Sequence, residues 1–217
     1  MHSVNPVPSA TLRPAVFLDR DGTLIEDRGH LRSGVEAVFF PDTAGALRRL
    51  QDRFLLFIVT NQPGIAEGIL SHAHVEDVNG HIVERLAGEG VTIADVYYCP
   101  HKRTDRCDCI KPSPLFLHRA AARHGVDLGR SFVVGDHPHD VDMARRASAK
   151  GVYVLTGHGM KHLQELSGDA TIIARDIGEA AELILQTTRA EAALPNLRPN
   201  PCGDLPEVAP SAYVDPS

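Results

Sequence analysis

The chain has 217 residues, which is enough for one domain with a full hydrophobic core and short for two. Its net charge is −6 with acidic and basic residues interspersed, so it lacks the basic surface that tracks a nucleic-acid backbone. It contains no apolar run of about twenty residues, and its start lacks the charged and apolar regions of a secretory signal, so we expect a cytoplasmic protein without a membrane partner.

Short apolar runs alternate with amphipathic segments along most of the chain. The runs have the length of buried strands, and the segments between them have helical periodicity. This alternation predicts an α/β fold of the Rossmann-like type, a parallel sheet with helices on both faces. The predicted strands are 15–19, 54–59, 94–98, 131–134, 152–155 and 171–174. The predicted helices are 42–52, 71–88, 113–124, 136–149 and 176–189.

One domain is expected over residues 14–190, and we expect it to be a monomer. Residues 1–13 carry prolines and no periodicity, which predicts a loose arm. Residues 191–217 are dense in proline and predict an extended or disordered tail. Residues 20–41 are rich in glycine and charge and predict a flap over the end of the first strand. The sequence contains no internal repeat.

Two carboxylates end the first predicted strand, in the stretch LDRDGT. Residues two apart in extended chain lie on the same side at about 6.5 Å, so Asp19 and Asp21 can face one substrate while Arg20 faces away. Gly22 then lets the backbone leave the strand. Short Asp/Gly strings more often make turns or helix caps, so this pair carries little weight alone.

Polar residues also follow three of the later predicted strands. Thr60 and Asn61 follow the second, Lys111 comes after the third and a Cys/His-rich loop, and Asp136 and Asp140 follow the fourth. Taken singly, each has an ordinary explanation as a strand end, a surface lysine or a helix cap. Because parallel strands end at one edge of a sheet, the set together predicts a site there.

The motifs LDRDGT, VTNQ, KP and VVGDHPHD occur in this order between residues 15 and 158. In this they resemble the haloacid-dehalogenase-like (HAD-like) phosphohydrolases. The resemblance implies a HAD-like fold and hydrolysis of phosphate monoesters through an aspartyl-phosphate intermediate. Asp19 would be the nucleophile, and Asp21 would act as general acid and then as general base. Thr60 and Lys111 would complete the catalytic set by stabilising the phosphoryl oxygens.

The same resemblance implies a Mg²⁺ cofactor, because carboxylates facing a dianion need a cation between them. Asp19, Asp136 and the backbone carbonyl of Asp21 would supply hard oxygen ligands. Asp140 would orient Lys111 or a metal-bound water. The candidate substrate contacts are Thr23, Asn61, Ile110 and His137. For His137, an ordinary solvated loop position stays open as an alternative.

Four potential soft-metal ligands lie within CPHKRTDRCDC: Cys99, His101, Cys107 and Cys109. Two close pairs with five residues between them can enclose a tetrahedral Zn²⁺ within one loop. With four protein ligands this zinc would be structural. The alternative is four unrelated buried or reactive side chains. Cys202, in the predicted tail, has no expected partner.

A zinc loop directly before KP resembles the subgroup of heptose bisphosphate and histidinol-phosphate phosphatases, which lack a large cap domain. Those enzymes commonly carry CRKP, whereas this chain has CIKP, with Ile110 in the arginine's place. An arginine can bind a second phosphate in bidentate fashion, and isoleucine cannot. We expect a heptose 1,7-bisphosphate that loses its 7-phosphate, with histidinol phosphate or another small metabolite as the alternative. Arg32, Lys102 or Arg103 could supply the missing contact.

Two readings from other classes remain. A phospho-acceptor signalling domain also combines an aspartate, a threonine and a lysine at a sheet edge, but Asp21 would speed the loss of its acyl phosphate. A zinc-stapled interaction module with idle catalytic residues is the third reading. Turnover of a generic phosphate ester would distinguish a phosphatase, whose partner is a small phosphate ester, from such an inactive interaction module.

Overall fold

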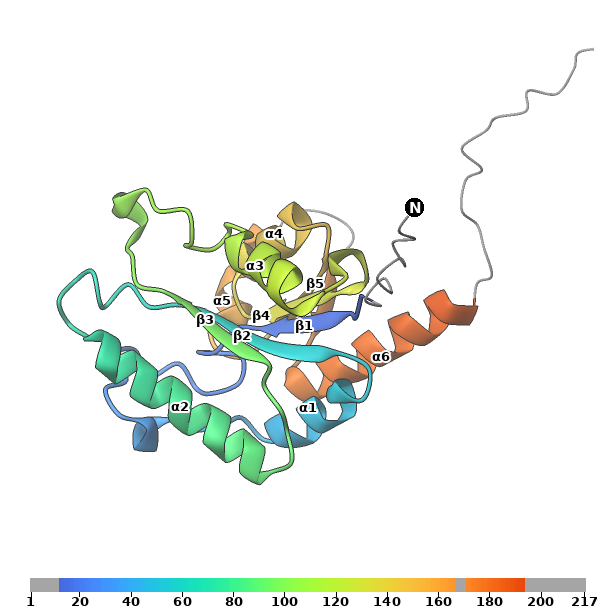
Figure 1. The fold of residues 1–217 in the computed structure, drawn as a ribbon, viewed down its shortest axis with the longest axis horizontal. Coiled ribbons are helices and arrows are strands. Elements are labelled where there is room, and N and C mark those ends of the chain that lie inside the picture. The colour runs from blue at the N-terminus through green and yellow to red at the C-terminus, as the bar shows by residue number, and fades with distance from the viewer. Residues whose placement is uncertain (1–11, 167–170, 194–217) are drawn as a thin grey trace, which may run out of the picture.

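The computed structural model describes residues 12–166 and 171–193 and places them in one parallel sheet with helices on both faces (Figure 1). The predicted α/β architecture is therefore confirmed. The strand order is β3-β2-β1-β4-β5-β6. The strands are β1 (Ala15–Leu18), β2 (Leu55–Asn61), β3 (Asp95–Cys99), β4 (Phe132–Gly135), β5 (Lys150–Val154) and β6 (Ile172–Ala174).

Helices α1 to α5 lie between successive strands, as parallel pairing requires, and α6 follows the last strand. They are α1 (Thr43–Gln51), α2 (His72–Gly88), α3 (Leu115–His124), α4 (Pro138–Arg146), α5 (Gly159–His162) and α6 (Ile177–Ala193). The sequence did not predict α5, because four residues show no periodicity. The helix predicted to reach residue 149 ends at Arg146, because β5 already begins at Lys150. None of the helices in the described part of the chain is long and apolar enough to cross a membrane.

Helix ends follow the expected chemistry at two positions and depart from it at a third. The Ser71 hydroxyl accepts a hydrogen bond from the backbone N–H of His74 at 3.2 Å, which starts α2. Gly125 takes a left-handed conformation and ends α3. Asp42 precedes α1 but its side chain does not cap the helix. Its φ of 60° turns the carboxylate toward Arg49, at 3.1 Å.

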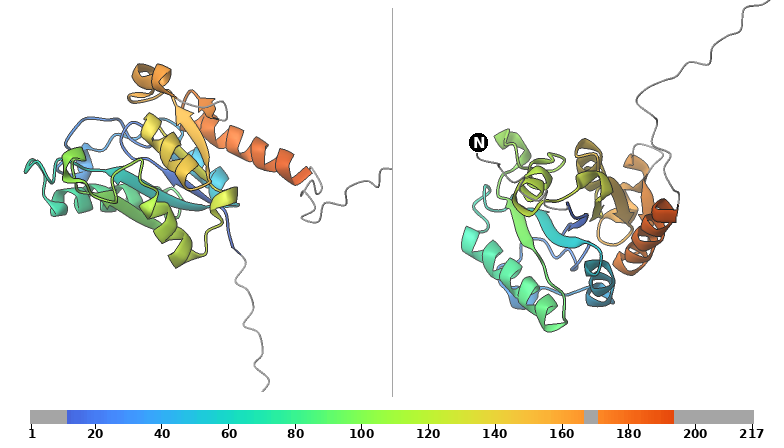
Figure 2. Two further views of the ribbon diagram at one scale, coloured as in Figure 1. Left: turned by 90° about the horizontal axis from the view of Figure 1, so that it is seen from above. Right: turned by 45° about the vertical axis from the view of Figure 1, so that its right-hand side comes forward.

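Alternate residues of β1 enter two different hydrophobic clusters. Val16 and Leu18 pack with residues of α1, α2 and α6, whereas Ala15 and Phe17 pack with residues of α3 and α4. Phe17 stacks on Phe57 of β2 with ring centroids 5.1 Å apart. Figure 2 shows the helices on the two faces of the sheet. Each large side chain buried in this way contributes about 1.5 to 3 kcal/mol, so β1 is held firmly from both faces.

The order of the strands switches sides at β1: β2 and β3 are added on one side of it, and β4, β5 and β6 on the other. Leu18 lies beside Ile58 of β2 on one side and Val134 of β4 on the other. Crevices at such a switch point, at the carboxyl ends of the strands, are where open α/β sheets bind ligands. The residues that follow Leu18, Ile58 and Val134 in the chain therefore meet at one place.

The predicted arm and tail fall largely on residues that lie outside the described part of the chain. The last residue assigned to the arm, Arg13, is described and pairs with Val126, so it belongs to the domain. At the other end, α6 continues to Ala193, beyond the helix end predicted at residue 189.

Candidate active site

A buried lysine joins two carboxylates at the end of β1. Lys111 Nζ lies 2.5 Å from Asp19 Oδ1 and 2.7 Å from Asp140 Oδ1. All three residues are at most 9 % exposed. The backbone N–H of Lys111 donates to Asn61 Oδ1 at 3.1 Å, which ties the lysine to the end of β2. Four of the residues predicted for the site thus meet, although they lie at or beyond the ends of four different strands.

Asp136 enters this group from the end of β4. Its Oδ2 accepts a hydrogen bond from the backbone N–H of His158 at 2.7 Å. A Cβ placed on Gly22 would lie 2.1 Å from this oxygen, and one on Gly157 would lie 2.2 Å from it. Both glycines also have positive φ angles, of 80° and 54°. Glycine is therefore required at both positions, because any side chain would displace Asp136.

Asp19, Asp136 and Asp140 form a carboxylate cluster whose ligand oxygens all lie within 4.8 Å of one another. Burial, together with repulsion from Asp19, raises the pKa of Asp136 to about 8. Burial also raises the pKa of Asp19 to about 6, against the opposing effect of Lys111. Burial alone would lower the pKa of Lys111, but the Asp140 and Asp19 carboxylates outweigh it and raise that pKa. One ammonium does not balance three carboxylates, so this hard-oxygen set fits a divalent cation such as Mg²⁺.

Asp21 lies beside the cluster and is held by side chains from two segments. Its Oδ2 accepts hydrogen bonds from Arg20 Nε at 3.0 Å and Gln62 Nε2 at 2.9 Å. Burial raises the pKa of Asp21, and the positive charge of Arg20 opposes that rise. Arg20 is fully buried and does not line the cavity, in agreement with its expected orientation away from a substrate. No pattern in the sequence predicts the contacts of Arg20 and Gln62 with Asp21.

A cavity of about 320 Å³ opens over these groups. It is lined by Asp19, Asp21, Thr60, Asn61, Pro63, Arg103, Lys111, Asp136, His137, His139, Asp140 and His158. Of the four predicted substrate contacts, Asn61 and His137 line it. Thr23 is fully buried and does not reach it, because the turn after β1 directs that side chain inward. Ile110 packs against the hydrophobic cluster on the α3 side of the sheet instead.

Two histidines and an arginine form part of the cavity rim. His137 Nδ1 and His139 Nδ1 lie 2.6 Å apart, and Arg103 Nη2 lies 3.1 Å from His139 Nδ1. Burial is the main reason why the pKa of each histidine falls to about 4, so both rings are neutral at pH 7. Arg103 is therefore the cationic member of this group. Its place beside the VVGDHPHD motif could not be found from the sequence, because it depends on the path of the Cys/His loop.

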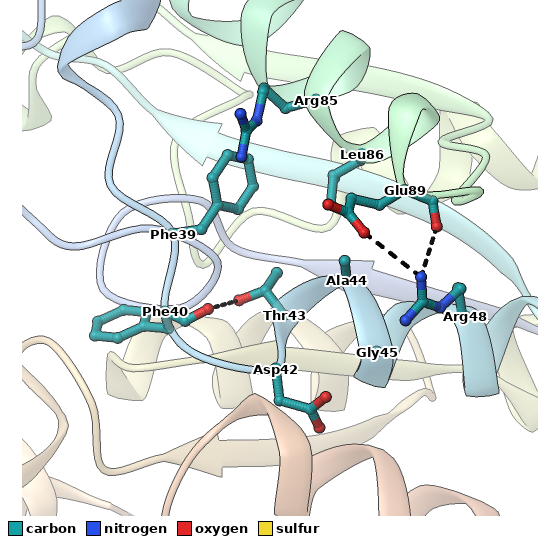
Figure 3. A pocket seen from close by; sticks show the side chains of 10 residues that line it. All are labelled: Phe39, Phe40, Asp42, Thr43, Ala44, Gly45, Arg48, Arg85, Leu86 and Glu89. Atoms are coloured by element: carbon teal, nitrogen blue, oxygen red, sulfur yellow. Dashed lines mark hydrogen bonds and ion pairs between the residues drawn. The ribbon is translucent and has the colours of Figure 1, made fainter.

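A second cavity, of about 290 Å³, lies between α1 and α2 (Figure 3). Phe39 and Leu86 provide apolar surface, and Arg48 lies at one side. Arg48 Nη1 donates to the backbone carbonyl of Glu89 at 2.9 Å and lies 3.6 Å from the Glu89 carboxylate. None of the residues predicted for catalysis or metal binding lines this cavity. The strand-edge cavity is therefore the candidate active site.

The second predicted metal site also assembles. Cys99, His101, Cys107 and Cys109 bring their ligand atoms together and form the Cys/His cluster. Cys107 Sγ lies 3.6 Å from Cys99 Sγ and 3.7 Å from Cys109 Sγ. Sulfurs around a tetrahedral zinc lie about 3.8 Å apart, given Zn–S bonds near 2.3 Å. The Cys99–Cys109 separation of 2.8 Å is shorter, but the donor set and the remaining geometry fit zinc.

Known proteins resemble this chain in sequence and in structure. The family model described as HAD-hydrolase-like matches residues 108–180. The D-glycero-beta-D-manno-heptose-1,7-bisphosphate 7-phosphatase of Pseudomonas aeruginosa is 33% identical over 80% of this chain and 99% of its own length. A D-glycero-D-manno-heptose-1,7-bisphosphate 7-phosphatase of Thermosynechococcus vestitus is 34% identical over 79% of this chain and 95% of its own.

A solved structure agrees with these relatives. D,D-heptose 1,7-bisphosphate phosphatase from B. bronchiseptica, complexed with magnesium and phosphate, superposes with a TM-score of 0.74 at 30% identity. The match covers 80% of this chain and 99% of that one. The chain therefore belongs to the HAD-like hydrolase family. Within that family it is a phosphatase.

Proposed function

We propose that the protein hydrolyses a sugar phosphate with the help of Mg²⁺ and through an aspartyl-phosphate intermediate. The observation that carries this proposal is the meeting of Asp19, Lys111, Asp136 and Asp140 at the switch point, with Asp21 beside them. The relatives named as heptose bisphosphate phosphatases, and the magnesium and phosphate in a similar solved structure, support it.

In the first step, a carboxylate oxygen of Asp19 attacks the phosphorus atom and the bond from phosphorus to the ester oxygen breaks. Asp21 gives its proton to the departing oxygen, which leaves as an alcohol. In the second step, water attacks the acyl phosphate, Asp21 takes a proton back, and inorganic phosphate and free Asp19 result. Lys111 offsets negative charge on the phosphoryl group in both steps, and the Thr60 hydroxyl lies in the same cavity.

Asp19 and Asp136, with the backbone carbonyl of Asp21, would hold the Mg²⁺. When bound, this cation neutralises the charge that the carboxylate cluster and a phosphate dianion would otherwise bring together. We further propose that the Cys/His cluster holds a structural Zn²⁺, because its four ligands leave no open position for a substrate.

We propose a heptose 1,7-bisphosphate, cleaved at its 7-phosphate, as the substrate. Ile110 has no charge with which to bind the distal phosphate, so a cationic side chain elsewhere must bind it. Arg32 donates to the backbone carbonyl of Ile69 at 3.2 Å, and neither Arg32 nor Lys102 lines the cavity. Arg103 does line it, at the rim, and we propose that Arg103 contacts the distal phosphate. A monophosphate such as histidinol phosphate is the second candidate, because the apolar Ile110 replaces a phosphate-binding side chain.

The test compares kcat/KM for the heptose 1,7-bisphosphate, for the heptose 7-phosphate, which lacks the distal group, and for histidinol phosphate. A charge-assisted contact worth about 1.5 to 3 kcal/mol should favour the bisphosphate roughly 10- to 150-fold over the monophosphate. Asp19→Asn protein, purified in parallel, controls for contaminating phosphatases. Equal values for the two sugars would exclude the bisphosphate, and a preference for histidinol phosphate would establish the second candidate.

A further inference from the structure

Arg20 is a buried cation that the proposed reaction does not use. It stands between the two catalytic carboxylates in the sequence, yet its side chain is only 1 % exposed and does not line the active-site cavity. Arginine is almost never fully buried unless it is paired, because its desolvation costs several kcal/mol. Its partners in the interior must therefore offset that cost, and their identity indicates what the residue does.

The guanidinium of Arg20 is held at two of its edges. Nε and Nη2 lie 3.0 and 2.9 Å from the same oxygen, Asp21 Oδ2. Nη1 donates to Asn79 Oδ1 at 2.8 Å. Asn79 is a buried residue of α2, far from Arg20 in the sequence. A planar group bonded at both ends cannot turn without breaking these contacts, so α2 fixes Arg20 and Arg20 fixes Asp21.

Gln62, just beyond the neighbouring strand β2, completes the support of Asp21. Its Nε2 lies 2.9 Å from Asp21 Oδ2 and 3.0 Å from Thr60 Oγ1. Asp21 itself lies just beyond β1, where the chain turns at Gly22, so the ladder of the sheet does not hold it. Its orientation therefore depends on these side-chain donors.

We propose that Arg20, held in turn by Asn79, is a positioning residue that fixes the Asp21 carboxyl group for proton transfer to the departing oxygen. This inference rests on the proposed function, in which Asp21 is the general acid. General acid catalysis contributes about 10²- to 10⁴-fold, and a displacement of about 1 Å can remove about 10²-fold. A loosened Asp21 should therefore slow the departure of poor leaving groups and spare good ones.

The experiment measures kcat/KM with Mg²⁺ for two probes that differ in their leaving groups. p-Nitrophenyl phosphate releases a stable phenolate that needs little protonation, whereas glycerol 2-phosphate releases an alkoxide that needs a proton. Asn79→Ala should lose about 10-fold on glycerol 2-phosphate and less than about 2-fold on p-nitrophenyl phosphate. Arg20→Met should lose about 100-fold in kcat/KM on glycerol 2-phosphate, and Arg20→Lys should recover part of that loss.

Ser131→Ala is the matched control for a general loss of stability. Ser131 is also buried, and its hydroxyl accepts a hydrogen bond from the backbone N–H of Ala15 at the opposite end of β1. It should lower the melting temperature without changing the ratio between the two probes. Equal losses on both probes in the Asn79→Ala and Arg20→Lys proteins, as expected of a merely structural role, would overturn the inference.

The Asp21→Asn background separates this inference from the proposed function. If Arg20 acts through Asp21, adding Asn79→Ala to Asp21→Asn should cause no further change in the probe ratio. A strong leaving-group effect in Asp21→Asn together with unchanged ratios in the Arg20 and Asn79 variants would overturn this inference alone. An Asp21→Asn protein without any leaving-group effect would overturn the acid role and, with it, this inference.

Discussion

The carboxylate cluster and the Cys/His cluster are built in opposite ways. The carboxylate cluster joins Asp19 to Asp136 and Asp140, which follow strands far apart in the sequence, and its charges do not balance. The Cys/His cluster comes from the end of β3 and a single loop, and its four ligands can satisfy one metal by themselves. The sheet keeps the carboxylates together despite their mutual repulsion, whereas the Cys/His cluster, with its metal, would order the loop that carries it.

This difference predicts that the two clusters fail separately. The packed strands β1 and β4 already fix the positions of the carboxylates, so losing one carboxylate should cost activity and leave the fold. The loop from residue 100 to residue 110 has only short 3-10 structure, at Arg103–Asp105, so losing one ligand should cost local order first.

The largest effect is expected from Asp19→Asn. Without the proposed nucleophile, kcat should fall by at least about a thousandfold. The melting temperature should not fall, because burial raises the pKa of Asp19 to about 6 even against the effect of Lys111, so the charged carboxylate costs stability at neutral pH. Phosphate release and thermal melting measure the two outcomes. Retained turnover would remove the nucleophile assignment, and a collapse of the fold would contradict the separation of the two clusters.

Cys107→Ser should affect stability before chemistry. Zinc binding at structural sites contributes on the order of 10 kcal/mol, so losing a ligand should release the metal and destabilise the loop by several kcal/mol. Metal analysis after gel filtration should give about one zinc per chain in the native protein and none in the variant. Cys202→Ser, outside the described residues and outside the cluster, is the matched control. A native protein that is folded, reduced and free of zinc would exclude the zinc site.

Mg²⁺ should stabilise the protein through the carboxylate cluster alone. At a concentration of 100 times Kd, a ligand bound only by the folded state raises the free energy of unfolding by about 2.7 kcal/mol. Thermal melts of chelator-treated protein with added Mg²⁺ measure this gain. Asp136→Asn should abolish it, whereas Glu89→Gln, in the cavity of Figure 3, should keep it. A gain that survives in Asp136→Asn would place the cation elsewhere.

The smallest effect is expected where the two clusters meet, at Arg103. This residue lies in the Cys/His loop but lines the cavity over the carboxylates. Arg103→Met should lower kcat/KM for the heptose bisphosphate about 10-fold, equal to about 1.4 kcal/mol, and leave the monophosphate unchanged. Lys102→Met, next to it and outside the cavity lining, is the control. An equal loss on both substrates would mean that Arg103 does not read the distal phosphate.

The sequence was sufficient for the parts of the molecule that depend on local pattern. Apolar runs located the strands, and because parallel strands end at one edge, Asp19, Lys111 and Asp136 could be expected to meet. The Cys/His cluster could be predicted from spacing alone, because its four ligands lie within eleven residues of the chain.

Contacts that depend on the packing of side chains from distant elements could not be predicted. The bond from Arg20 to Asn79 needs the exact rotation of α2 against β1, which no periodicity specifies. Thr23, in the LDRDGT motif, is among the predicted substrate contacts, but the direction of the turn buries it. Ile110 was expected at the substrate from its place before Lys111, but an apolar side chain gains more in the hydrophobic cluster.

The position of β1 at the centre of the sheet has a consequence for synthesis on the ribosome. β1 and β2 are made first and can pair at once, but the other edge of β1 waits for β4, more than 70 residues further along the chain. At about 5 to 20 residues per second, that edge stays open for roughly 4 to 15 s. An unpaired apolar strand edge is a template for aggregation, so the nascent chain should depend on chaperones during that interval.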